Sequence, residues 1–302
     1  MAKLIDMPTT PNFVRSNFTL NRAVGSVASP YTGKIRTQEY DGVFWSAEVS
    51  LPPMRRDVAK NWQTFLTQLN GPVNNFRFSD PDALTKQGTF SGNTLQFESR
   101  VNESSATLSF TASTNTIAGA SSETYFNNTL VGDHIVITGS AKTENNGTHK
   151  VLTKANAYTI TVEPVDHNSL VDESNKSGCT IKDNVKGAKG LNLKAGGNTG
   201  SGTILTGDYL GLSDVSTNDQ TGYIPTQYIL VTADATETDN GSSARNQYSL
   251  RTEPKLRQNY SANDRVYITT AKGLFRLTTN TVSWDADNIS NYGISFACVE
   301  VV

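Results

Sequence analysis

The sequence is poor in the residues that most often carry catalysis, metal binding or covalent cross-links. Its 302 residues include only two cysteines, Cys179 and Cys298, and three histidines. Two cysteines far apart in the chain exclude a disulfide framework, and we expect two buried free thiols. Charged residues make up 18% of the chain, and the formal net charge is −2. Nothing in this balance suggests a general nucleic-acid-binding protein, which would need a basic face.

Long apolar runs are also missing. No stretch approaches the ~20 apolar residues that cross a bilayer as a helix, and the opening MAKLIDMP lacks the apolar segment of a secretory signal. We therefore expect a soluble protein made in a cytoplasm. Ser, Thr, Asn and Gly replace the missing charge, which is typical of β-rich proteins with many turns. Aromatic and β-branched residues continue to the end of the chain and argue against disorder.

Only one segment has convincing α-helical spacing, from about Arg55 to Leu69. Asp57 lies in its first turn, where the helix dipole favours a carboxylate. Asn70-Gly71-Pro72 follows it, with Gly71 as a candidate left-handed cap and Pro72 as a helix breaker. The apolar side chains of this segment form a single stripe: Val58, Trp62, Phe65, Leu66 and Leu69.

Strands are predicted on both sides of this helix. Val43–Leu51 alternates apolar and polar residues with a period of two and ends at Pro52-Pro53, because proline has no N–H for a strand ladder. Phe76–Phe78 alternates in the same way. We therefore expect a helix packed on a sheet, with a core that contains Trp45, Trp62, Phe65, Leu69, Phe76 and Phe78.

Two turn signals precede this region. Ser29–Gly33 predicts a turn, and Asp41-Gly42 predicts a hairpin of the favoured type. The second signal predicts that the polar strand Lys34–Tyr40 pairs with Val43–Leu51. Residues 1–12 contain two prolines and are expected to form an extended N-terminal segment.

The composition changes after Asp80-Pro81-Asp82. Residues 88–183 are rich in Ser, Thr and Asn, lack helical periodicity and contain a strong hairpin signal at Asn146-Gly147. From about Val185, longer β segments resume and continue to the last strand, Ile294–Glu300. We therefore predict a mainly β protein: a β-sandwich or barrel core with one packed helix, made from residues 1–87 and 184–302, and an inserted all-β domain at residues 88–183.

The predicted core resembles phage distal tail proteins, which sit at the end of long non-contractile tails. Four elements carry the resemblance in order: Trp45–Met54, the helix, Asn70-Gly71 and Phe76–Pro81. Ser29–Gly33 also matches the pattern. The second half of the family is resembled by Val185–Ala188, Leu191–Leu193 and Ile204–Leu210. The inserted residues resemble short β modules that recur in phage structural proteins.

This resemblance implies a structural component of a bacteriophage tail tip. Family members form a closed hexameric ring that connects the tail tube to the hub or baseplate and leaves a channel for DNA. The implied partners are other copies of the chain, the tail tube protein and the tail hub protein, while DNA only passes through. The implied location is the virion, with the host cytoplasm as the place of assembly.

We predict that the ring interface combines the N-terminal segment with the Arg251–Arg257 segment, including Arg251, Lys255 and Arg257. The inserted module would face outward as a docking platform for a tail fibre. An alternative function is host-surface glycan binding or adhesion by this module, with aromatic rings as stacking platforms: Tyr125, Phe126 and Tyr158.

An enzymatic function has little support in the sequence. The chain contains neither a Gly-x-Ser-x-Gly elbow nor a phosphate-binding Gly-x-x-x-x-Gly-Lys-Ser/Thr loop. Its acidic groups, Asp80 with Asp82 and Asp234 with Glu237 and Asp239, have the spacing of ordinary turn residues. A zinc or nickel site that uses His134 and His149 facing each other across a hairpin is conceivable, but closely spaced ligands are missing and His167 stands apart. We expect no catalysis, no metal and no cofactor.

Overall fold

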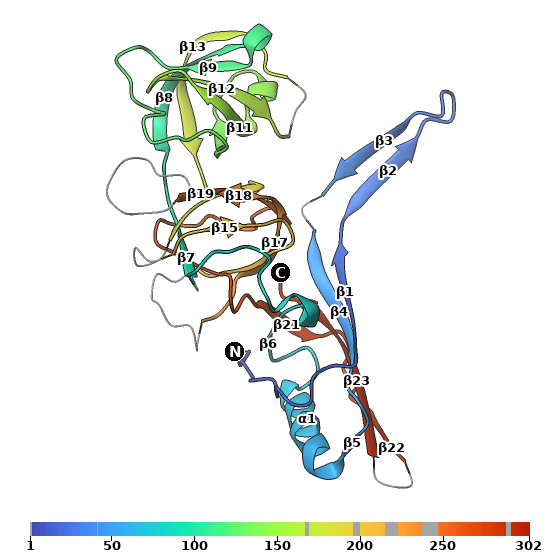
Figure 1. Ribbon diagram of the computed structural model, residues 1–302. Helices are drawn as coiled ribbons and strands as arrows, with labels where there is room; N and C mark the ends of the chain where they lie inside the picture. Colours follow the sequence, from blue (N-terminus) through green and yellow to red (C-terminus); the bar gives the residue numbers. More distant parts are fainter. Residues whose placement is uncertain are drawn as a thin grey trace.

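The computed structural model describes residues 2–40, 42–92, 94–166, 169–195, 200–214, 223–236, 247–287 and 291–302. Within these ranges the protein is mainly β and has a single α-helix, α1 (Arg56–Leu69), which confirms the predicted fold class. Its body has three parts: a sheet that carries α1, a central closed barrel and a second closed barrel formed by inserted residues (Figure 1). A two-stranded arm projects from the sheet.

The sheet joins the two ends of the chain. Its strand order is β1 (Arg15–Asn21), β4 (Phe44–Ser50), β23 (Asn291–Glu300), β21 (Gly273–Leu277) and β6 (Phe76–Phe78). Neighbouring strands are antiparallel. Two short strands, β5 (Met54–Arg55) and β22 (Trp284–Ala286), pair with β23 outside this path. Strands more than 200 residues apart therefore form one sheet.

Helix α1 packs its apolar stripe against the sheet. Its buried residues include Trp62, Phe65 and Leu69, and the helix starts one residue later than predicted. The chain leaves the helix at Asn70, which has a left-handed φ of 51° and donates its N–H to Thr67 O. Asn70 is thus the cap, and Gly71 extends the left-handed turn. Asparagine tolerates this backbone region better than most other residues.

All six predicted core residues are buried: Trp62, Phe65 and Leu69 on α1, Phe76 and Phe78 on β6, and Trp45 on β4, where its indole N–H donates to Tyr228 O of the central barrel. They belong to one cluster together with residues from strands at both ends of the chain. Phe65 and Phe76 meet edge to face at 5.4 Å between ring centroids, and Phe13 from the N-terminal part meets Trp62 at 5.7 Å. Edge-to-face geometry suits the positive ring edge and negative ring face of aromatic side chains. Both cysteines are buried and free.

The central barrel closes in the order β14 (Gly190–Ala195), β19 (Gln247–Glu253), β17 (Gln227–Ala233), β16 (Tyr209–Leu212), β20 (Arg265–Tyr267) and β7 (Thr94–Phe97). A small ribbon of β15 (Thr203–Ile204) and β18 (Ala235–Thr236) accompanies it. The predicted start of the insertion at residue 88 is wrong. Strand β7 lies after that residue, but it pairs with β14 and β20 and therefore belongs to the core. The barrel cannot close without it, so the inserted strands begin only after Phe97.

The inserted residues form their own closed barrel. Its order is β10 (His134–Thr138), β11 (Gly147–Lys154), β12 (Thr159–Pro164), β9 (Thr116–Ala118), β8 (Asn102–Thr111) and β13 (Glu173–Lys182). Asn146-Gly147 is not a two-residue hairpin turn as predicted. Strands β10 and β11 are joined by a longer connection with a short 3-10 helix, Thr143–Asn145, and the Asn146 side chain accepts the Ser140 N–H at 2.9 Å.

The arm consists of β2 (Val24–Ala28) and β3 (Ile35–Glu39), joined at Ser29–Lys34. The turn predicted at Ser29–Gly33 is present, with hydrogen bonds between Ser29 and both Gly33 and Lys34. The pairing predicted from Asp41-Gly42 is wrong. Strand β3 pairs with β2, and β4 pairs with β1 and β23. The physical reason is that β1–β2 and β3–β4 are the two legs of one long hairpin (Figure 1), so β3 and β4 follow one another along the same leg. Asp41 itself lies outside the described residues.

Candidate assembly surfaces

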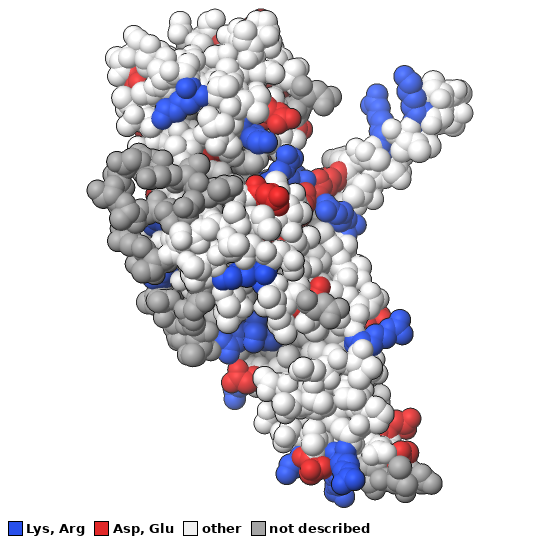
Figure 2. All heavy atoms as spheres, in the orientation of Figure 1, with Lys and Arg blue, Asp and Glu red and all other residues white. Residues whose placement is uncertain are grey.

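The arm exposes apolar side chains that nothing in the described chain covers. Val27, Tyr31 and Ile35 are 73%, 95% and 67% exposed. Within the described residues, β2 and β3 pair only with each other, so both outer edges of the arm are free. Figure 2 shows it standing away from the body, with Lys and Arg side chains along it. An isolated two-stranded hairpin is marginally stable in water, and free edges with apolar side chains are typical of surfaces that bind another chain.

Surface ion pairs attach the base of the arm to the barrels. Glu39, on β3, lies 3.7 to 3.9 Å from Arg22, Lys189 and Lys255. Glu253 of the central barrel accepts from Lys189 at 2.7 Å and from Arg22 at 3.3 Å. These side chains are partly exposed, so each pair contributes little, on the order of 0–1 kcal/mol. The arm is therefore held at its base by contacts that salt can weaken.

A buried carboxylate connects the sheet to the central barrel. Glu300, on β23, accepts the Trp45 N–H at 3.2 Å, the Tyr228 N–H at 2.9 Å and Arg257 Nη2 at 2.6 Å. Arg257 also donates to Val43 O. Because Trp45 belongs to the sheet and Tyr228 to the barrel, this one side chain bridges both parts. Three charge-assisted hydrogen bonds offset much of the cost of burying its charge.

The basic residues predicted at a ring interface mostly contact their own chain. Arg257 pairs with Glu300 at 2.6 Å, and its role at a neighbouring subunit stays a prediction. Lys255 lies 3.9 Å from both Glu39 of the arm and Asp166 of the inserted barrel. Arg251 is half-buried on β19, paired with Gly190 in register. The role of Arg251 and Lys255 at an interface stays a prediction.

The N-terminal segment also packs on its own chain. Lys3 and Ile5 exchange backbone hydrogen bonds with Asn75, and Trp62 donates its indole N–H to Thr10 O at 3.0 Å. Ile5 and Met7 contribute to the core beneath α1. This segment is not a projecting arm in the described structure. The hairpin of β2 and β3 projects from the body instead, and it was not predicted because β3 was expected to pair with β4.

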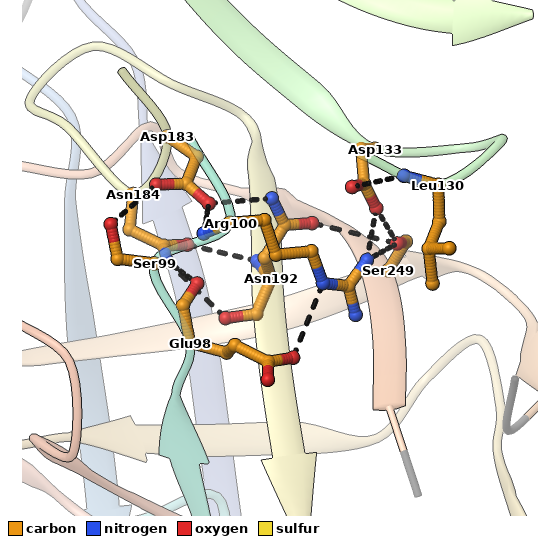
Figure 3. A network of polar contacts seen from close by, with 9 residues as sticks. All are labelled: Glu98, Ser99, Arg100, Leu130, Asp133, Asp183, Asn184, Asn192 and Ser249. Carbon is orange, nitrogen blue, oxygen red and sulfur yellow. Dashed lines mark hydrogen bonds and ion pairs between the residues drawn. The ribbon is translucent and has the colours of Figure 1, made fainter. Parts of the chain in front are cut away.

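A polar network holds the inserted barrel on the central barrel (Figure 3). The two connections between the barrels, residues 98–101 and 183–189, are tied to each other by Asp183. Its carboxylate accepts the Arg100 N–H at 2.8 Å and the Asn192 side-chain amide at 3.0 Å. The Asn184 amide donates to Glu98 O at 2.8 Å and its oxygen accepts the Asn192 N–H at 2.8 Å. Asp183, Asn184 and Asn192 are all buried.

Arg100 carries the network across to the loop before β10. Its guanidinium pairs with Asp133 of the inserted barrel and donates to Ser249 of the central barrel at 3.1 Å. It also donates to Glu98 at 3.2 Å. Ser249 in turn donates to Asp133, which accepts the Leu130 N–H at 2.8 Å. Burial raises the pKa of Asp133, and the nearby Arg100 opposes this shift.

His134 fills the space beside this network. Its ring lies against Gly190, where a Cβ atom would overlap the imidazole. Neither ring nitrogen has a hydrogen-bond partner among the described residues. Burial, followed by the positive charges of Arg251 and Lys150, lowers the pKa of His134 to about 4. The imidazole is therefore neutral near pH 7, and the contact is a close apolar fit.

The predicted histidine pair does not form. In the β10–β11 register, His134 is opposite Lys150 and Ile135 is opposite His149. Because side chains alternate between the two faces of a sheet, His134 and His149 point to opposite faces. His149 lies 3.0 Å from Asn145 O. Among the described residues there is no group of three potential metal ligands, and His167 lies outside them.

The aromatic residues proposed as glycan platforms are mostly internal. Phe126 is fully buried in the core of the inserted barrel, so its assignment as glycan-facing is wrong. Tyr125 packs against the same core, and its hydroxyl oxygen accepts the Thr107 N–H at 3.3 Å. Tyr158 is half-buried. Buried rings contribute to packing and cannot stack on a sugar.

The acidic groups also have structural surroundings where they are described. Asp234 accepts the Thr206 N–H at 2.7 Å, as expected of a turn residue. Glu237 and Asp239 lie outside the described residues, as does the side chain of Asp82. Asp80 directly precedes a short 3-10 helix, Pro81–Ala83, and its side chain lies beside the Tyr209 hydroxyl. No helix of the described residues is long and apolar enough to cross a membrane.

No protein-family model matches the chain, and no curated protein sequence matches it.

Proposed function

We propose that this chain is a non-catalytic structural subunit of a bacteriophage tail tip, of the distal tail type, which assembles into a closed ring. The arm is the observation that carries this proposal. It exposes apolar side chains and two strand edges that the described chain leaves uncovered. A second copy of the chain that received this arm would bury those side chains and pair those edges.

Such a contact would be heterologous, because the arm and the surface that receives it are different parts of the chain. Heterologous contacts generate rings when the rotation closes and filaments when it does not. The resemblance to distal tail proteins favours a hexameric ring, between the tail tube protein and the tail hub protein, with a channel for DNA. In this assembly the chain is located in the virion, and it assembles in the host cytoplasm.

The attachment of the inserted barrel supports the same role. Its buried polar network fixes the barrel relative to the core, so every copy in a ring would present it at the same angle. A regularly repeated domain is suited to docking a tail fibre. Glycan binding by this domain has less support, because Phe126 is buried and Tyr125 packs internally.

The proposal is tested by the mass and shape of the purified chain. Multi-angle light scattering is expected to give a closed oligomer, and negative-stain images are expected to show rings with a central hole. A monodisperse monomer at high concentration would contradict ring assembly. A double variant, Val27→Asp with Ile35→Asp, is expected to remain folded but monomeric, because both side chains are exposed in one copy. The matched control is Val131→Asp, 60% exposed on the inserted barrel, which is expected to leave the ring intact.

A further inference from the structure

A cleft of about 350 Å³ lies between the N-terminal segment and the sheet next to α1. Its walls are mainly apolar and include Met7, Phe13, Trp62, Phe78 and Leu84. Leu84 at the rim is 63% exposed, whereas Trp62 and Phe78 form a buried floor. Pockets of this size with apolar walls are typical of sites that hold one large side chain or a small ligand.

Two cations converge on this apolar cleft. Arg77 comes from β6, and Lys272 directly precedes β21. These two strands pair with Gly273 opposite Phe78 and Leu274 opposite Arg77, so the cations come from neighbouring strands. Arg77 donates to Asp6 at 3.1 Å, on the solvent side, since the Asp6 side chain is 88% exposed. Among the described lining residues there is no Asp or Glu.

The cleft is electrostatically prepared for an anion. Burial, and then the charge of Arg77, lowers the pKa of Lys272, while Asp6 acts in the opposite direction. Within the described residues, no carboxylate lies within ion-pair distance of the Lys272 ammonium. Two cations in partly desolvated surroundings gain more from a bound carboxylate than exposed cations do, because the local dielectric constant is lower than in water.

We propose that this cleft binds a segment of a partner protein that carries a carboxylate beside a large apolar side chain. The apolar side chain contacts Phe13, Trp62 and Leu84, and the carboxylate faces Lys272 and Arg77. Charge complementarity selects this occupant over a purely apolar one, which would desolvate the Lys272 ammonium further without supplying a carboxylate. The site is complete within one copy of the chain, so it does not depend on ring assembly.

A matched pair of probes tests the site. N-acetyl-L-phenylalanine carries the ring and a carboxylate, whereas N-acetyl-L-phenylalaninamide carries the ring without the charge. Titration of the full chain, followed by NMR and calorimetry, is expected to show the carboxylate probe binding about tenfold more tightly than the amide. Lys272→Gln is expected to remove this preference. Lys34→Gln on the arm is the control and is expected to retain it.

A second variant tests the apolar wall. Leu84→Asp changes an exposed rim residue, so the fold should survive, and it is expected to weaken the carboxylate probe at least about tenfold through repulsion and lost contact. Equal binding of the two probes, no binding of either, or a preference that survives Lys272→Gln would overturn the proposal. Because the probes are small molecules, these outcomes are distinguishable from a failure of ring assembly, which light scattering reports separately.

Discussion

The arm and the inserted barrel both leave the central body of the chain, but they are attached in different ways. The barrel is held by buried groups that satisfy one another, among them Arg100, Asp133 and Asp183. The arm is held at its base by partly exposed ion pairs around Glu39. Buried networks have one well-defined geometry, whereas exposed pairs are weak and screened by salt. The inserted barrel therefore has one fixed orientation on the body, whereas the angle of the arm can vary.

The largest effect is expected from Asp133→Ala. This change leaves the Arg100 guanidinium buried without its main carboxylate partner, which typically costs about 3–5 kcal/mol. Amide hydrogen exchange in β10 and β14 should accelerate, because the two barrels separate more easily. Asp285→Ala, on the exposed strand β22, serves as the control and should change the free energy of unfolding by less than about 0.5 kcal/mol. Unchanged exchange in the Asp133 variant would show that the network does not hold the barrel.

The pH dependence of the free energy of unfolding tests the attachment of the inserted barrel through His134, which lies beside the buried network. Its pKa is about 4 in the folded protein, below the ordinary value of 6.5, so the folded state binds fewer protons than the unfolded state. The contribution of the neutral His134 side chain to the free energy of unfolding is therefore fully present above pH 6.5. It is lost as the pH falls towards 4, by about 3 kcal/mol in total.

The difference in unfolding free energy between the wild type and His134→Leu isolates this contribution. Asp133 titrates in the opposite direction, since burial raises its pKa, but it is present in both proteins and cancels. The wild type is expected to lose stability relative to the variant between pH 7 and pH 4.5. A difference that stays constant over this range would contradict the assignment of His134 as a buried neutral side chain.

Gly190→Ala is expected to have the next largest effect. The new methyl group would overlap the His134 ring, and overpacking of this kind typically costs about 1–3 kcal/mol. Urea unfolding should show a lower free energy of unfolding, and hydrogen exchange should locate the change at the contact between the two barrels. Gly293→Ala is a matched control, because nothing lies within 4 Å of its new Cβ. Similar losses in both variants would show that the close contact is unimportant.

The smallest effect is expected at the base of the arm. Glu39→Gln removes partly exposed ion pairs with Arg22, Lys189 and Lys255, so the loss of stability should be below about 1 kcal/mol. The angle of the arm should become more variable, which distance measurements between spin labels on the arm and on the central barrel would detect. Raising the salt concentration should broaden the wild-type distances in the same way. A rigid arm in the variant would contradict an electrostatic attachment.

The sequence predicted local features well and pairings less well. The helix at Arg56–Leu69 was found because its apolar stripe and cap residues lie within one short window. The partner of β3 was missed because a strand's register depends on distant segments, and Asp41-Gly42 looks like a turn whether or not the chain reverses there. The boundary of the inserted barrel was misplaced because β7 closes a barrel whose other strands lie between residues 190 and 267.

The polar network between the two barrels could not be predicted from the sequence either. Glu98, Arg100, Asp133, Asn192 and Ser249 are ordinary polar residues with no shared motif, and only the folded chain brings them together. The cleft near Lys272 has the same character, since its walls come from the N-terminal segment, α1, β6 and the residue before β21. Asp133 directly precedes β10, and its role between the two barrels depends on Arg100 and on Ser249 of the central barrel.

The connections to the inserted barrel enter and leave side by side, since Asn102 is paired with Lys182 and Arg100 with Asp183. A short loop could therefore connect the same two points without disturbing the strands of the central barrel. The chain thus consists of a core whose strands depend on one another and an inserted barrel that could be exchanged. Another domain could therefore replace the inserted barrel at this single place.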